Sequence, residues 1–145
     1  MLAATQGGMA FANASVTLIH GMSRPIGALF HVPHGMSNAM LLPEVTAWSV
    51  GHAEARYADA ARCMGIATNA DSDNLACEKL VAALRTLCAE LSVPTPGEFG
   101  IDPTIWNDSL SLMADQALAS GSPANNPRIP EAEEIVELYQ RVWSG

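Results

Sequence analysis

The chain has 145 residues, of which 49% are hydrophobic and 15% are charged, and its formal net charge is −8. This length fits one domain, and the charged fraction is well below the roughly 25% of an average soluble protein. The acidic balance excludes the clustered basic side chains that bind nucleic acid phosphates. No basic amphipathic segment indicates a membrane surface as a partner either.

Charge is distributed unevenly along the chain. Of the 7 Lys and Arg and 15 Asp and Glu residues, only Arg24 lies in residues 1–43. Met1 and the residues after it lack the positive start and apolar run of a signal peptide. Polar residues and Pro25 interrupt every apolar window long enough to span a membrane. The first third of the chain is therefore expected to be buried inside protein.

The cysteines indicate a reducing compartment. Cys63, Cys77 and Cys88 are odd in number and widely spaced, and no two of them form a CxxC pair. This pattern predicts free thiols, and a cytoplasmic protein, rather than a disulfide framework or a metal-binding cysteine cluster.

The first part of the chain predicts two helices and a connection. Residues 1–22 are helix-like, although no capping residue precedes Met1. Prolines and glycines over residues 25–35 predict a connecting segment. The next helix is expected over residues 35–50, where Pro43 should kink or end it.

Four more helices complete the expected fold, over residues 53–64, 74–91, 103–120 and 130–143. Gly65 and Gly121 follow two of them in the place where a glycine commonly ends a helix. Asp102 supplies a capping side chain before a proline in the first helical position. A stripe on the second of these helices is expected in the core: Leu80, Leu84, Leu87 and Leu91. The sequence predicts a single all-α domain over residues 1–145, a helical bundle of about six helices.

Three histidines, His20, His31 and His34, lie in the nearly chargeless third, in the segment HGMSRPIGALFHVPHG. The spacing of His20 and His34 matches no short zinc-binding pattern, so both could equally be core histidines bonded to backbone. Neutral imidazole is nevertheless a natural ligand for iron or zinc. The two side chains would converge if the connection over residues 25–33 doubled back.

A family resemblance adds to this reading. The stretch NASVTLIHGMSRPIGALFHVPHGMSNAMLLP closely resembles the helical C-terminal region of the iron-containing, or group III, alcohol dehydrogenases. The segments ALASGSPANNPRIP and EEIVELYQRVW resemble the closing part of the same family. The resemblance implies an oxidoreductase that interconverts alcohols and aldehydes or ketones with NAD or NADP. It also implies Fe(2+), or sometimes Zn(2+), as a Lewis acid on the substrate oxygen.

The resemblance implies residue roles as well. In the family, the histidine of the HG element and the histidine of the PHG element bind the metal, and these positions are His20 and His34. The family's other two ligands and its nucleotide-binding domain precede this region, so the chain is expected to be truncated at its N-terminus and inactive alone. Many members carry another histidine where this chain has Arg24, which puts a histidine proton relay there in doubt. Arg24 could instead face a cofactor phosphate or a substrate carboxylate, or pair with a carboxylate of the missing domain.

The remaining polar residues have weaker signals. His31 is expected to line the same pocket on the cofactor side, and His52 is expected at the surface. Asn125 and Asn126 are interpreted as turn residues in a loop over residues 122–128.

Two other functions stay open beside a dehydrogenase domain: a stand-alone helical module that binds a metal or a protein partner, and one subunit of a split enzyme. If the first third forms the wall of a cleft whose other side is absent, its apolar face should be partly exposed. We then expect self-association through that face.

Overall fold

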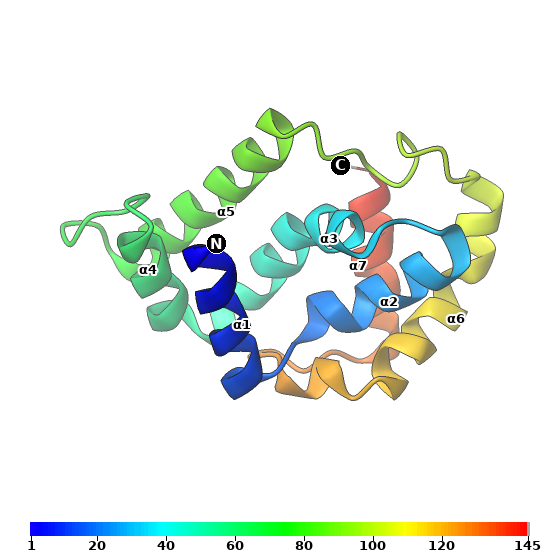
Figure 1. Cartoon of the computed structure of the whole chain (residues 1–145), viewed down its shortest axis with the longest axis horizontal. Helices are drawn as coiled ribbons and strands as arrows, with labels where there is room; N and C mark the ends of the chain where they lie inside the picture. The colour runs from blue at the N-terminus through cyan, green and yellow to red at the C-terminus, as the bar shows by residue number, and fades with distance from the viewer. Residues whose placement is uncertain (145) are drawn as a thin grey trace.

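The computed structural model describes residues 1–144, and within them it contains α-helices, short 3₁₀-helices and no strand (Figure 1). The α-helices are α1 (Leu2–Ala14), α2 (Leu18–Phe30), α3 (His34–Ser49), α4 (Glu54–Cys63), α5 (Asp73–Glu90), α6 (Pro103–Ala119) and α7 (Ala132–Ser144). The 3₁₀-helices are η1 (Val50–His52) and η2 (Ser122–Asn125). This confirms the predicted all-α fold, with one helix more than expected.

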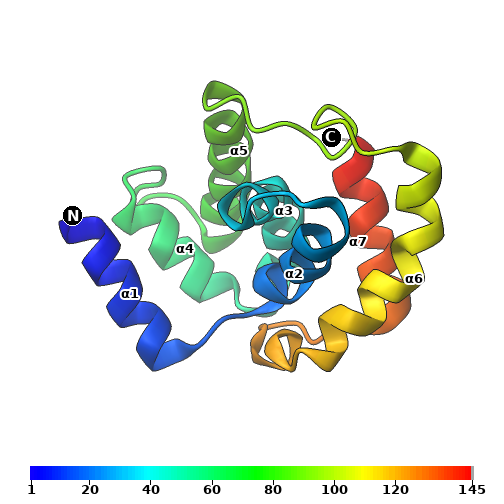
Figure 2. The same ribbon diagram turned by 45° about the vertical axis from the view of Figure 1, so that its right-hand side comes forward.

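The helices pack around two apolar clusters. The larger cluster lies among α2, α3, α6 and α7, and the smaller one lies between α4 and α5. Trp106 is at the centre of the larger cluster, because its ring lies 5.5 Å from that of Phe30, 5.7 Å from Tyr139 and 5.5 Å from Trp143. Helix α3 contacts α2, α5 and α7 and thus joins the two clusters (Figure 2).

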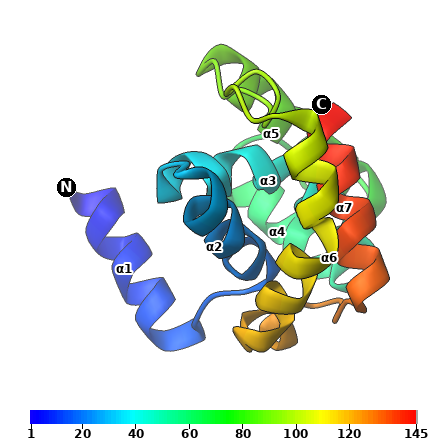
Figure 3. The same ribbon diagram turned by 90° about the vertical axis from the view of Figure 1, so that its right-hand side faces the viewer.

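Helix α1 buries none of its side chains. It lies at one edge of the molecule and is joined to the rest by residues 15–17 (Figures 2 and 3). Leu2, Met9 and Phe11 are 73%, 63% and 58% exposed. The expected burial of the whole first third is therefore wrong for α1, where these large apolar side chains are exposed.

Two boundaries in the first third differ from the prediction. The helix expected over residues 1–22 is broken at Ser15, which has a left-handed φ of 63°, because the following Val16 and Thr17 are β-branched and favour helix weakly. The connection expected over residues 25–35 is helical as far as Phe30. Pro25 is tolerated inside α2 because it is buried in the core together with Met22 and Ile26, so tertiary packing offsets the lost hydrogen bond.

The later boundaries agree with their local signals. The Asp102 carboxylate accepts hydrogen bonds from the Thr104 and Ile105 amides at 2.8 and 3.0 Å, as a cap should. Gly65 and Gly121 follow α4 and α6 with φ of 72° and 73°. Helix α3 continues through Pro43 to Ser49 rather than ending there.

The predicted leucine stripe is only half buried. Leu80 and Leu84 lie in the smaller cluster, whereas Leu87 and Leu91 are 44% and 68% exposed. The reason is length, since α4 has 10 residues and α5 has 18, so that α4 covers only part of its partner. No helix within residues 1–144 combines the length and hydropathy that a bilayer span requires.

Candidate metal centre

Helices α2 and α3 bring His20 and His34 together. His20 lies in the first turn of α2, and His34 is the first residue of α3. The short segment of residues 31–33 leads back along α2 (Figure 1), so the starts of the two helices come side by side. The imidazole ring centroids are 5.0 Å apart, with the ring planes at 62°. The predicted convergence is confirmed, although a shorter reversal than the expected 25–33 connection produces it.

Two imidazoles at this spacing fit a shared metal ion. Nitrogens that each lie about 2.1 Å from one tetrahedral ion stand roughly 3.4 Å apart, which rings this close can provide. No set of three or more His, Cys, Asp or Glu side chains suited to a metal occurs in residues 1–144. In the part of the chain that the structure describes, the two histidines are therefore candidate ligands without a third such side chain beside them.

The surroundings of His20 favour its neutral form. Partial burial lowers the pKa of His20, and the nearby His34 and Arg24 lower it further because each can carry a positive charge. A neutral imidazole keeps the lone pair that binds a metal. Arg24 lies one turn after His20 on α2, is exposed, and has no ion pair within residues 1–144.

His31 caps the C-terminal end of α2 and does not lie beside His20 and His34. Its backbone has a left-handed φ of 56°, and its N–H donates to the Gly27 carbonyl oxygen at 3.1 Å. Histidine adopts this conformation more readily than most residues. The side chain is exposed and does not join His20 and His34 in a metal-binding group of three. His52 is exposed, as predicted.

A mainly apolar cavity of about 580 Å³ adjoins His20. Its walls come from the end of α1, the linker after it, α2 and α3, and its lining includes Phe11, Val16, Ile19, Leu42, His20 and Asn38. Apolar walls lower the local dielectric constant and so strengthen the pull of a bound cation on an oxygen ligand.

Asn38, which the sequence analysis did not single out, contacts the ring of His34. It lies one turn later on α3, and its amide nitrogen Nδ2 is 3.1 Å from Nε2 and 3.3 Å from Nδ1 of His34. The same Nδ2 donates to the His34 carbonyl oxygen at 2.7 Å. The available signal was the spacing of four residues, which places two side chains on one helix face.

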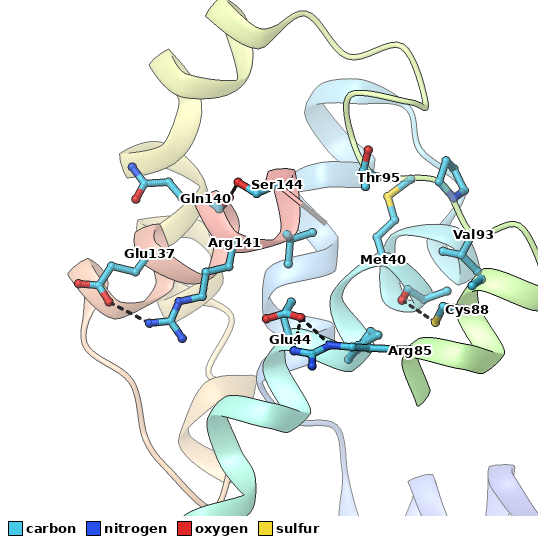
Figure 4. A pocket seen from close by; sticks show the side chains of 15 residues that line it. Met40, Glu44, Arg85, Cys88, Val93, Thr95, Glu137, Gln140, Arg141 and Ser144 are labelled. Carbon is cyan, nitrogen blue, oxygen red and sulfur yellow. Dashed lines mark hydrogen bonds and ion pairs between the residues drawn. The ribbon is translucent and has the colours of Figure 1, made fainter. Parts of the chain in front are cut away.

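A second cavity, of about 790 Å³, lies among α3, α5 and α7 and contains neither His20 nor His34 (Figure 4). Its charged side chains are paired with each other: Arg85 donates to Glu44 at 2.8 Å, and Arg141 lies 3.6 Å from Glu137. Although this cavity is larger, its neutralised charges offer no ligand set for a metal, so it is not the candidate centre.

The closing loop is more than a turn. The Asn126 N–H donates to the Pro123 carbonyl oxygen at 3.1 Å, as the turn interpretation requires. The Asn126 side chain is buried and donates to Ser49 Oγ at 3.0 Å, and Asn125 donates to the Val16 carbonyl oxygen at 3.0 Å. The loop thereby holds the α1–α2 linker and the end of α3, and it contributes no side chain to the histidine pair.

Comparisons with known proteins extend this picture. Residues 1–143 match the family described as "Fe-containing alcohol dehydrogenase family, C-terminal". Lactaldehyde reductase of Escherichia coli K12 is 34% identical over 136 residues, which cover 94% of this chain and 35% of that protein. NADPH-dependent butanol dehydrogenase of Clostridium saccharobutylicum is 30% identical over 139 residues, 95% of this chain and 35% of that protein.

A solved structure supports the same family assignment. The iron-containing alcohol dehydrogenase from Thermococcus thioreducens superposes with a TM-score of 0.86 at 35% identity, covering 99% of this chain and 36% of that one. The chain thus spans about a third of the length of the relatives it matches. On its sequence and its helical architecture, the chain belongs to the iron-containing alcohol dehydrogenase family and corresponds to its C-terminal domain.

Proposed function

We propose that this chain is the metal-binding C-terminal domain of an iron-dependent alcohol dehydrogenase, in which His20 and His34 supply two ligands to Fe(2+) or Zn(2+). The observation that carries the proposal is the 5.0 Å separation of the two rings at the starts of α2 and α3. Family membership supports it, because the description of the family names iron.

The chemistry follows from this placement. A bound divalent ion would supply Lewis acidity toward the oxygen of an alcohol or carbonyl substrate, and NAD or NADP would carry the hydride. The residues of this chain prepare the site: partial burial favours the neutral form of His20, and mainly apolar side chains line the cavity beside it.

Arg24 is the proposed contact to an anionic group, either a cofactor phosphate or a substrate carboxylate. An arginine side chain offers hydrogen-bond donors and no acceptor, so it cannot act as a general base. Its exposure and its place one turn after His20 suit a contact to a bound molecule. Pairing with a carboxylate of another domain is the competing assignment. His31, exposed at the end of α2, is proposed to line the cofactor side.

The isolated chain is proposed to be catalytically incomplete. Its relatives are about three times as long, and residues 1–144 contain no group of three or more side chains suited to binding a metal. The proposed partner is the N-terminal nucleotide-binding domain, and the apolar surface of α1 is the proposed surface of self-association without it. The free thiols of Cys63, Cys77 and Cys88 suit a reducing cytoplasm.

A metal titration tests the proposal. Zn(2+), or Fe(2+) without oxygen, is titrated into the wild-type chain, into a variant with both His20→Ala and His34→Ala, and into His52→Ala. The wild-type chain and His52→Ala should bind equally, and the double variant should lose the affinity. Equal binding by all three would refute the histidine pair as ligands. In a parallel assay with NAD(H) or NADP(H) and a short alcohol, no turnover is expected, and turnover would refute incompleteness.

A further inference from the structure

The closing loop is anchored beside the start of α2. Pro123 in η2 is buried, and a Cβ added to Gly21, the residue after His20, would lie 2.9 Å from Pro123 Cγ. At the other end of the loop, the buried side chain of Asn126 donates to Ser49 Oγ at 3.0 Å. The loop is therefore held against the rest of the chain at two points.

The linker of residues 15–17, which leads into α2, has little support from its own side. Thr17, the N-cap residue of α2, makes no side-chain hydrogen bond to the first turn. The first N–H groups of a helix also have no carbonyl partner within it. Helix α1, which precedes the linker, buries none of its side chains. Contacts from elsewhere in the chain therefore decide how the linker enters α2.

Asn125 supplies such a contact from the anchored loop. Its Nδ2 donates to the Val16 carbonyl oxygen at 3.0 Å. Val16 lies four residues before His20, and both residues line the cavity of about 580 Å³. The hydrogen bond thus holds one wall of that cavity and the backbone from which the first turn of α2 begins.

We propose that Asn125 is a positioning residue for His20. Its amide holds the first turn of α2 in the place where the His20 ring lies 5.0 Å from the His34 ring. The inference rests on the proposed metal site, because the role of Asn125 is to keep the two imidazoles at a spacing that one ion can share. Asn125 is exposed, so its removal should affect metal affinity more clearly than it affects stability.

The first test is amide hydrogen exchange in the metal-free chain, compared among the wild type, Asn125→Ala and Ser72→Ala. Ser72 is the matched control, since its Oγ caps α5 by accepting from the Leu75 amide at 3.2 Å. Each variant should loosen its own helix start. The Gly21 amide should exchange about two- to tenfold faster in Asn125→Ala, and the Ala76 amide should do so in Ser72→Ala. An unchanged Gly21 rate in Asn125→Ala would overturn the inference.

The second test is a titration of the same three chains with Zn(2+) alone. Asn125→Ala should bind about two- to tenfold more weakly, because a smaller fraction of the chain has the arrangement that binds the metal. Ser72→Ala loses a stabilising contact on a helix without histidines and should bind like the wild type. Wild-type affinity in Asn125→Ala would overturn the inference. An equal loss of affinity in Ser72→Ala would overturn it as well, because the effect would then be one of general stability.

The double variant His20→Ala, His34→Ala separates this inference from the metal site on which it rests. If the double variant binds zinc as the wild type does, or if no chain binds zinc, the proposed metal site fails and the positioning role fails with it. If the double variant loses zinc and Asn125→Ala binds it fully, the metal site stands and only the positioning role fails.

Discussion

The hydroxyl of Tyr139 on α7 donates a 2.7 Å hydrogen bond to the carbonyl oxygen of Met22, two residues beyond His20 on α2. Both residues are completely buried. Burial raises the pKa of Tyr139 far above its usual value, so the hydroxyl remains a donor throughout the ordinary pH range. The bond ties the helix that carries His20 to the last helix of the chain.

Tyr139→Phe should therefore lower the free energy of unfolding by about 1 kcal/mol, the usual net worth of such a bond. The Met22 carbonyl keeps its position within α2, which limits the loss. Urea denaturation followed by circular dichroism measures the change, and exposed His52→Ala should leave the midpoint unaltered. A Tyr139→Phe chain as stable as the wild type would mean that the bond contributes nothing.

The residue next to His20 is a glycine for a steric reason. A Cβ at Gly21 would lie 2.9 Å from Cγ and 3.0 Å from Cδ of Pro123 in η2, where side chains cannot approach so closely. Gly21→Ala should cost about 1–3 kcal/mol of stability, because α2 must move away from η2. Gly7→Ala is the matched control, since nothing lies within 4 Å of its added Cβ and alanine favours helix. If both variants unfold at the same urea concentration, the packing argument is wrong.

The two asparagines of the closing loop should differ in their effect on stability. Asn126→Ala removes a buried amide that bonds Ser49 Oγ at 3.0 Å and the Arg128 carbonyl oxygen at 2.8 Å. We expect a loss of about 1–3 kcal/mol in thermal or urea unfolding. Asn125→Ala removes an exposed contact to Val16 and should cost about 1 kcal/mol or less. A larger loss of stability in Asn125→Ala than in Asn126→Ala would show that the buried hydrogen bonds of Asn126 are not what stabilises the loop.

The carboxylate of Asp71 provides a pH test. A hydrogen bond from Lys79, at 2.7 Å, and another from the Thr68 amide lower the pKa of Asp71 from 3.8 to about 2. A pKa lower in the folded state means that the ionised group stabilises the fold above pH 3.8, and that this contribution is lost as the pH falls toward 2. Lys79→Ala should raise the pKa of Asp71 toward 3.8 in a carboxyl ¹³C NMR titration. Arg141→Ala should leave it unchanged, and a low pKa that survives in Lys79→Ala would exclude the lysine as its main cause.

Helix ends set by local chemistry could be predicted from the sequence. Asp102 caps α6 through its own side chain, and Gly121 follows α6 in a conformation that glycine favours. Pro25 misled the prediction because its effect depends on the core around it, which the local sequence does not contain. The break at Ser15 had only weak propensity signals.

The candidate site also contains some features that the sequence could predict and others that it could not. The family resemblance predicted that His20 and His34 act together, and the structure brings their rings within 5.0 Å, whereas their sequence spacing alone matched no metal pattern. Asn38 was missed although it lies four residues after His34, because the sequence does not show which rotamers bring the two side chains into contact. The structure begins α3 at His34, one residue before the predicted start, and places the amide on the ring. Sequence patterns do not predict such a contact, because they give neither the exact first residue of a helix nor the rotamers of its side chains.

The central claim is that the metal binds to imidazoles of this chain. X-ray absorption at the zinc edge of the chain loaded with one equivalent of Zn(2+) tests it most directly. We predict only nitrogen or oxygen neighbours at about 2.0–2.1 Å, with imidazole scattering from two histidines that disappears in the His20→Ala, His34→Ala double variant. Sulfur neighbours at about 2.3 Å, or imidazole scattering that persists in the double variant, would contradict the account.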